Sequence, residues 1–285
     1  MAKKKTEHHY ENRVVAFVDI LGFKDILSKT VDKDNNDVQS QIDKVTDAYY
    51  SIRDVWDLDD EISNENPELK KAYDEIKSNS KIVTTFSDSI VISFLQKEPS
   101  EIFSTLLELK WLIMRLISRG ILCRGALAYG KMIHTDKFLF GPALVEAYET
   151  ESKAALYPRI IVSRELIQMA GQARAEHHDS KTEIEYVRKL LKEDTDGMYY
   201  IDYFLGAQSE LDDPENDFPT YINEVSEVIR KGVRSTRPDV KIKYMWMRDK
   251  VNRVIATGKK EDWIKKLRND GNEDLADAYL ALKRV

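Results

Sequence analysis

The sequence is poor in cysteine, with Cys123 the single one in 285 residues. A lone cysteine excludes an intrachain disulfide framework and fits a reducing compartment, where we expect Cys123 to behave as a small hydrophobe. Long apolar runs are also lacking, because no stretch approaches the roughly 18 consecutive apolar residues that span a bilayer. The polar start carries no apolar segment typical of a signal peptide. We therefore expect a cytoplasmic protein that does not enter a membrane.

Excess positive charge is absent too: 44 Lys and Arg stand against 50 Asp and Glu, a net charge of -6. A protein that coats nucleic acid needs a basic face that neutralises phosphates, so we expect no nucleic-acid partner. The hydrophobic fraction of 42% is enough for a core, and the charged fraction of 33% is typical of well-solvated helices. One catalytic domain with added segments fits this length.

Two segments rich in β-forming residues precede the middle of the chain. The run Arg13-Val-Val-Ala-Phe-Val-Asp-Ile-Leu-Gly-Phe23 is too short for a buried helix and predicts a central strand that ends at Asp19. Residues 81–94 contain two such runs separated by a polar stretch around Asp88, which predicts a hairpin with Asp88 at its tip. Further strands are expected within 121–134, 159–163 and 197–204.

Helical periodicity alternates with these strands. Apolar side chains recur at helical spacing over 24–56, 99–119, 142–155 and 165–177, and again throughout the tail that follows residue 217. Strands alternating with helices predict an α/β fold, an α+β sandwich. We expect a polar tail at 1–12, a catalytic domain at 13–204 with an acidic insertion at about 57–80, and a helical C-terminal extension at 205–285.

Asp19 and Asp88 are the first candidates for chemistry. A carboxylate at the end of an apolar strand loses hydration, and a bound divalent ion is a strong compensation. Alone, each is as typical of a turn or a helix cap. If the strand and the hairpin are neighbours, both carboxylates lie at one end of the sheet. Two hard oxygen ligands suit Mg²⁺ or Mn²⁺, and a pair of such ions supports phosphoryl transfer.

Four segments carry a family resemblance. Phe17-Val-Asp-Ile-Leu-Gly-Phe23 resembles the Asp-Ile-x-Gly-Phe signature of class III adenylyl and guanylyl cyclases, and Ser87-Asp88-Ser89 resembles their hairpin tip. Farther along, Arg124-Gly-Ala-Leu-Ala-Tyr-Gly130 is similar to their Arg-x-Gly strand region, and Phe140-Gly-Pro-Ala-Leu-Val-Glu-Ala-Tyr-Glu149 to their dimer-interface helix. The resemblance covers about residues 13–204.

The resemblance implies a ferredoxin-type sheet with covering helices and a two-metal site. In that family the first Asp gives its side chain and the next residue its backbone carbonyl, so the implied metal ligands are Asp19, Ile20 and Asp88. Gly22 would allow close approach of the triphosphate. Phe23 ends the same motif and is expected to line the substrate site.

Departures from the purine enzymes concern the base. Thr84 stands where they carry Lys or Glu, and Phe138 stands at the downstream partner position. Val145 and Glu149 replace their Asn and Arg. Together with Tyr157-Pro-Arg-Ile-Ile-Val162 and Lys243-Tyr-Met-Trp246, this combination resembles the bacterial pyrimidine cyclases of the Pycsar antiphage systems.

That resemblance implies cyclic UMP or cyclic CMP as the product, with UTP favoured over CTP. It further implies dependence on Mn²⁺ or Mg²⁺, a homodimer with active sites at the interface, and a separate effector protein that responds to the cyclic nucleotide.

The remaining site candidates each have a structural alternative. Arg124 or Arg159 could stabilise phosphate charge through the guanidinium fork, but a strand Arg equally often pairs with a carboxylate near the core. Phe86, Tyr50 and Tyr129 could stack on a pyrimidine, although a buried aromatic ring more often serves packing.

Two rival functions remain open at this point. One is an inactive cyclase-homology domain that binds a nucleotide or a partner, since the Asn and Arg of the purine enzymes are absent. The other is a diguanylate cyclase or polymerase palm, but the Gly-Gly-Asp/Glu-Glu-Phe hairpin of the former is missing.

Overall fold

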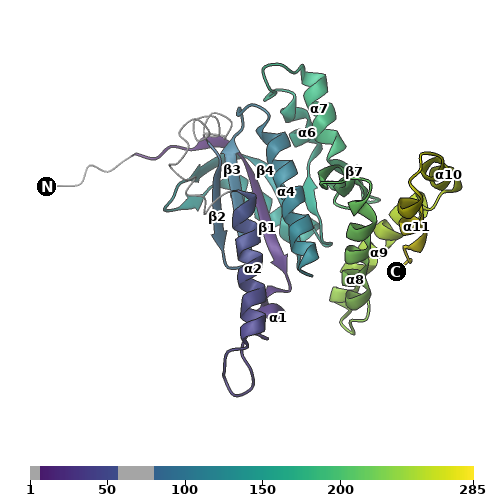
Figure 1. The fold of residues 1–285 in the computed structure, drawn as a ribbon. Coiled ribbons are helices and arrows are strands. Elements are labelled where there is room, and N and C mark those ends of the chain that lie inside the picture. The colour runs from purple at the N-terminus through teal and green to yellow at the C-terminus, as the bar shows by residue number, and fades with distance from the viewer. Residues whose placement is uncertain (1–6, 57–79) are drawn as a thin grey trace, which may run out of the picture.

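The computed structural model describes residues 7–56 and 80–285 (Figure 1). The expected acidic insertion at about 57–80 lies outside the described residues except for its last position, as do the first six residues of the expected tail.

A mixed α/β architecture confirms the predicted fold class. One sheet has the strand order β2-β3-β1-β4-β6-β8-β7, with β5 paired to β4. Every neighbouring pair in the first half, β2 to β4, is antiparallel, whereas β4 and β6 are parallel. The strands are β1 (Glu11–Leu21), β2 (Ile82–Phe86), β3 (Ser89–Leu95), β4 (Leu122–His134), β5 (Leu139–Phe140), β6 (Ile160–Val162), β7 (Leu191–Glu193) and β8 (Tyr199–Ile201).

The order β2-β3-β1-β4 is that of the predicted ferredoxin-type sheet. The connection from β1 to β2 contains helices, β2 and β3 form a hairpin, and a helix joins β3 to β4. The helices of this region are α1 (Phe23–Leu27), α2 (Gln39–Val55), α4 (Glu101–Ser118), α5 (Pro142–Ala154), α6 (Arg164–Ala170) and α7 (Ser180–Lys189).

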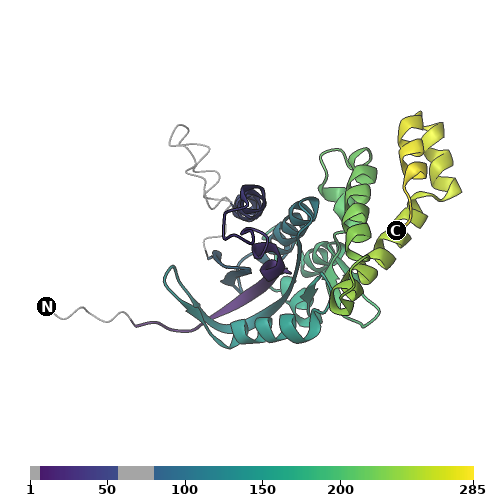
Figure 2. The ribbon, with the colours of Figure 1, turned by 90° about the horizontal axis from the view of Figure 1, so that it is seen from below.

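The two faces of the sheet are covered differently. Figure 2 shows α2 and α4 on one face and α5 on the other. Side chains of β1 alternate accordingly, because successive residues of a strand point to opposite faces. One set packs in the main core with α2 and α4 and consists of Val14, Ala16, Val18 and Ile20. The other set, Val15 and Phe17, packs in a small cluster with Ala143 and Ala147 of α5. Below, the side covered by α5 is called the α5 face.

From Leu205 onward the described chain is helical: η1 (Leu205–Glu210), α8 (Asp217–Gly232), α9 (Pro238–Gly258), α10 (Glu261–Asn269) and α11 (Glu273–Ala281). In Figure 1 these helices lie at the opposite side of the molecule from β2. Within the ranges that the structure describes, no helix has both the length and the apolar character needed to cross a bilayer.

Two sequence-based boundaries were wrong. The helix expected over 165–177 ends at Ala170, and a separate helix, α7, begins at Ser180. There the Asp179 carboxylate accepts a hydrogen bond from the Thr182 backbone N–H at 2.7 Å, which caps the new helix. The strand expected over 197–204 extends only from Tyr199 to Ile201, since Tyr203 leaves the sheet and its hydroxyl donates to the Pro158 carbonyl at 2.5 Å.

Candidate active site

Asp19 and Asp88 lie beside each other at one end of the sheet. Asp19 is paired in register with Ser89 of β3 on one side and Arg124 of β4 on the other. Asp88 lies in the turn between β2 and β3, and its carbonyl accepts a hydrogen bond from the Ile20 backbone N–H at 2.9 Å. The hairpin turn is therefore fixed to the end of β1, which meets the condition of adjacency on which the sequence-based expectation depended.

The Asp19 carboxylate lies in a negatively charged and partly dehydrated position, with 23% of its side chain exposed. Burial, and then the negative charges of Glu151 and Asp88, raise its pKa to about 6, although the positive charge of Arg124 opposes them. An added positive charge would relieve this repulsion, which is what a cation at this position supplies.

Arg124 is held by a buried carboxylate. Its Nε lies 2.5 Å from Oε1 of Glu151, which is only 1% exposed, and 3.9 Å from Oδ2 of Asp19. Nη1 reaches the carbonyl of Ala155 at a long 3.5 Å. The guanidinium is therefore fixed mainly through Nε, and it remains beside Asp19. Both readings of Arg124 apply: it pairs with a carboxylate near the core, and it lies at the candidate site.

Glu151 was missed in the sequence, although a signal was present. Ala143, Ala147 and Glu151 are spaced four residues apart on α5, and all three are buried. A carboxylate on the buried stripe of a helix requires a charged or hydrogen-bonding partner. The sequence could have indicated that need, but not that Arg124 meets it.

The residues present fit a divalent ion that shares its coordination with phosphate oxygens. In the described part of the chain, no group of three or more His, Cys, Asp or Glu side chains is arranged to hold a metal. Asp19, Asp88 and the backbone carbonyl of Ile20 offer oxygen ligands only. Mg²⁺ is commonly bound by one or two carboxylates together with substrate phosphates, so this smaller donor set matches it.

An apolar cavity of about 420 Å³ adjoins the carboxylates on the α5 face. Ser89, which is paired with Asp19 in the sheet, lines it, as does Phe86 before the Asp88 turn. Thr84 is a polar wall residue whose hydroxyl lies 2.9 Å from Nε2 of His134. The other wall residues are Phe17, Val91, Leu139, Leu144, Val145 and Tyr148.

Two further residues of the cyclase-like motif lie at the start of α1. Gly22 adopts a left-handed conformation with φ 73° and precedes the helix. A side chain there would be strained although the surrounding space is open. Phe23 is 8% exposed and packs in the main core against Tyr49, so within this chain it does not form a wall of the cavity.

Several of the aromatic candidates point elsewhere. Tyr50 is 62% exposed on α2, and Tyr129 is 39% exposed on β4. Phe138 packs against His8 and Phe140, whereas the next residue, Leu139, lines the cavity. Of the aromatic residues singled out for stacking, the described structure brings Phe86 to the cavity.

Tyr49, not Tyr50, contacts the hairpin turn. Its hydroxyl donates to the Ser87 carbonyl, and burial and the charge of Asp88 raise its pKa. Tyr49 shares helical spacing with Val45 and Ile52, so periodicity places it on the side of α2 that faces the sheet. This spacing was the available signal.

Arg159 has a structural role. Its side chain is 1% exposed and pairs with Asp194 at 2.8 Å and Asp196 at 2.5 Å. Asp194 also accepts from Trp246 Nε1 at 2.7 Å and from Lys250, both on α9. This buried network attaches α9 to the sheet, and with 1% of its surface exposed the Arg159 side chain is closed to a phosphate in solution. Of the two roles considered for Arg159, we therefore favour a structural ion pair over phosphate binding.

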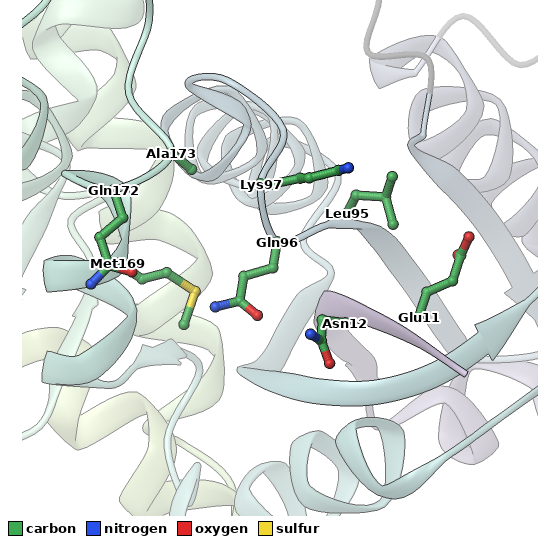
Figure 3. Close-up of a pocket in the computed structure, with 8 residues that line it drawn as sticks. All are labelled: Glu11, Asn12, Leu95, Gln96, Lys97, Met169, Gln172 and Ala173. Carbon is green, nitrogen blue, oxygen red and sulfur yellow. The ribbon is translucent and has the colours of Figure 1, made fainter. Parts of the chain in front are cut away.

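A second cavity, of about 590 Å³, lies away from the carboxylates (Figure 3). Glu11 and Asn12 of β1 and Gln96, Met169 and Gln172 surround it. Glu11 is paired with Met132, eight positions along β1 from the pairing of Asp19 with Arg124. This cavity is therefore separate from the candidate active site.

No family model matches the chain, and no curated protein matches it. Among solved structures, the adenylyl cyclase CyaB from P. aeruginosa is similar with 14% identity and a TM-score of 0.40, over 57% of this chain and 82% of that one. A bacterial light-regulated adenylyl cyclase aligns with 11% identity and a TM-score of 0.39, over 79% of this chain and 99% of that one. The catalytic core of a rhodopsin-guanylyl cyclase with converted specificity, in complex with ATPalphaS, aligns with 20% identity and a TM-score of 0.36, over 57% and 83%. Because these TM-scores are 0.40 or lower, we base the functional conclusion on the residues of the site.

Proposed function

We propose that this protein is a nucleotide cyclase of the class III type that converts a pyrimidine nucleoside triphosphate, UTP in preference to CTP, into the 3′,5′-cyclic monophosphate and pyrophosphate. The observation that carries the proposal is the convergence of Asp19 and Asp88 at one end of the sheet, beside an apolar cavity. The substrate and the single cysteine both fit a cytoplasmic protein.

In this reaction the 3′-hydroxyl of the ribose loses its proton to water, its oxygen attacks the α-phosphorus, the bond from that phosphorus to the bridging oxygen breaks, and pyrophosphate leaves with the negative charge. Asp19, Asp88 and the Ile20 carbonyl would hold two divalent ions, Mn²⁺ or Mg²⁺. When bound, such ions activate the attacking oxygen and neutralise the leaving phosphates.

The chain's own residues position the phosphates. Arg124 is held at Nε by Glu151 and, at a long 3.5 Å, at Nη1 by the carbonyl of Ala155, so its Nη2 would donate to phosphate oxygens. Ser89 and Phe86 connect the carboxylate end of the sheet to the cavity, so a triphosphate at Asp19 directs its base toward the α5 face.

The cavity supports a pyrimidine base. Thr84 and the apolar walls cannot repeat the charged side chains with which purine cyclases recognise their bases. Val145, where those enzymes carry Asn, lines the cavity, and Glu149, where they carry Arg, pairs with Lys153 at 2.9 Å. Stacking on Phe86 or Tyr148 would hold a small base with few polar contacts.

Assembly as a homodimer is part of the proposal and follows from the family resemblance. Large apolar side chains on the α5 face support it, since Phe86 is 78% exposed, Val145 56% and Tyr148 53%. A second copy that covers them would also enclose the cavity. The same resemblance leads us to propose that the cyclic nucleotide acts as a second messenger in antiphage defence, through a separate effector protein.

The rival is an inactive cyclase-homology domain that binds a nucleotide or a partner. Loss of a metal carboxylate would favour it, but both Asp19 and Asp88 are present. The absence of the purine-type Asn and Arg is the feature that favours an inactive domain.

The test is incubation of the pure protein with each of the four ribonucleoside triphosphates and Mn²⁺, followed by mass identification of the product. Cyclic UMP or cyclic CMP is expected, with ATP and GTP at least about tenfold less efficient, a difference of about 1.4 kcal/mol in transition-state binding. Asp19→Ala and Asp88→Asn should remove the product while the protein stays folded. Predominant cyclic AMP or cyclic GMP would contradict the pyrimidine assignment, and activity near wild type in either variant would contradict the metal assignment.

A further inference from the structure

A chain of hydrogen bonds leads from β1 into the wall of the apolar cavity. Arg13 Nε donates to Ser93 Oγ at 2.8 Å, and Ser93 Oγ lies 2.8 Å from Nδ1 of His134. Nε2 of His134 in turn lies 2.9 Å from the hydroxyl of Thr84. Arg13, Ser93 and His134 are buried, at 3%, 0% and 4% exposure. We call these four residues the Thr84 relay.

The chemistry of the groups fixes the direction of the first bonds. A guanidinium can only donate, so Ser93 Oγ accepts from Arg13. In the described structure the Ser93 hydroxyl has no acceptor besides Nδ1 of His134. Burying a hydroxyl without an acceptor costs free energy, so the Ser93 O–H donates a hydrogen bond to Nδ1.

His134 passes this direction on to Thr84. Burial, and then the positive charge of Arg13, lower the pKa of His134 to about 4, so the imidazole is neutral at pH 7. A neutral imidazole that accepts at Nδ1 carries its hydrogen on Nε2. Nε2–H therefore donates to Thr84 Oγ1, which leaves the hydrogen of the Thr84 hydroxyl available.

That hydrogen has no acceptor within the described chain. Thr84 lines the cavity, where the surrounding walls are mostly apolar. Once a base fills this space and excludes water, the Thr84 hydroxyl must either donate to the base or remain unpaired.

Building on the proposed cyclase function, we propose that His134 is a positioning residue which, held by Ser93 and Arg13, presents the Thr84 hydroxyl as a hydrogen-bond donor, and that the bond selects a carbonyl at position 4 of the pyrimidine. Uracil has the acceptor O4 at this position, whereas cytosine has an amino donor. Bound cytosine leaves the Thr84 hydrogen without an acceptor.

The test compares UTP with CTP for matched variants. Thr84→Val is isosteric and removes the hydroxyl, so the ratio of kcat/KM for UTP to that for CTP should fall about tenfold, mainly through UTP. Thr84→Ser keeps the hydroxyl and should keep the preference. Thr85→Val is the matched control, since it is the same substitution at the next position of β2, on the opposite face of the sheet.

The relay itself is tested at its inner members. His134→Leu and Ser93→Ala should each reduce the UTP to CTP ratio at least about threefold while CTP turnover stays within about twofold, a pattern that general loss of packing does not produce. Thermal unfolding checks that each variant is folded. If His134→Leu does not fold, Ser93→Ala alone tests the relay. A wild-type preference for CTP, or an unchanged ratio in Thr84→Val or in the folded relay variants, would overturn the inference and leave the cyclase function intact.

A binding measurement separates the two conclusions. The dissociation constants of α,β-methylene UTP and α,β-methylene CTP do not depend on turnover. If the wild type cyclises none of the four triphosphates, the proposed function fails. Tighter binding of the UTP analogue that is lost in Thr84→Val would still support the inference, and equal binding of the two analogues would overturn it.

Discussion

Replacing Asp19 with Asn should stabilise the metal-free protein while it removes activity. Burial and the charges of Glu151 and Asp88 hold the pKa of Asp19 at about 6 in the folded state. An aspartate in an unfolded chain has a pKa of about 3.9. The folded protein therefore binds this proton more tightly, and the free energy of unfolding falls as the pH rises from about 4 to about 6.

The size of the effect follows from that difference. About two pKa units at about 1.4 kcal/mol each give about 3 kcal/mol as an upper bound. Because 23% of the Asp19 side chain is exposed, solvent screening reduces this value, and we expect about 1–3 kcal/mol at pH 7.5. Asn carries no charge, so Asp19→Asn avoids the whole penalty above pH 6.

Urea unfolding in the presence of a chelator measures this difference. At pH 7.5 Asp19→Asn should be the more stable protein, and the gap should narrow as the pH is lowered toward 4. With Mn²⁺ at 100 times its dissociation constant, the wild type should gain about 2.7 kcal/mol and the variant little. Asp47→Asn, at an exposed position of α2, is the control and should change stability by less than about 0.5 kcal/mol. A metal-free Asp19→Asn that is less stable than wild type at pH 7.5, or a gap that does not depend on pH, would refute the electrostatic account of this site.

Three further perturbations test other parts of the structure. Arg159→Leu removes the guanidinium that pairs with Asp194 and Asp196, so Asp194 keeps only its α9 partners among these side chains; the free energy of unfolding should fall by about 1.5–3 kcal/mol in urea denaturation, whereas a loss under about 1 kcal/mol would argue against the network. Glu151→Gln weakens the hold on Arg124 and should lower kcat/KM about tenfold, while the same change at Glu185, exposed on α7, should leave it unaltered; equal kinetics in both variants would exclude a role for Glu151. Val145→Glu introduces a charge on the α5 face and should shift sedimentation from dimer to monomer, and a wild type that sediments as a fully active monomer would contradict the proposed dimer.

The sequence was most informative where structure is local. A β-rich run ending at Asp19 and a hairpin with a polar tip at Asp88 are short-range patterns, and the strands and turn appear where they were expected. To predict that the two carboxylates lie close together, we had to assume that β1 and β3 are adjacent. The ferredoxin-type strand order makes them adjacent. Helix ends were less predictable, because the Asp179 cap competes with an apolar pattern that continues past Ala170.

What the sequence by itself determined is therefore the α/β class, the central strand, the hairpin and the pair of aspartates, since each depends on residue order and side-chain period. Only the tertiary structure decided that Glu151 holds Arg124, that Tyr49 and not Tyr50 meets the Asp88 turn, and that His134 reaches Thr84 across 50 positions of sequence. These contacts join segments far apart in the chain. A polar side chain that is expected to be buried needs a partner, but the sequence does not indicate which residue that partner is.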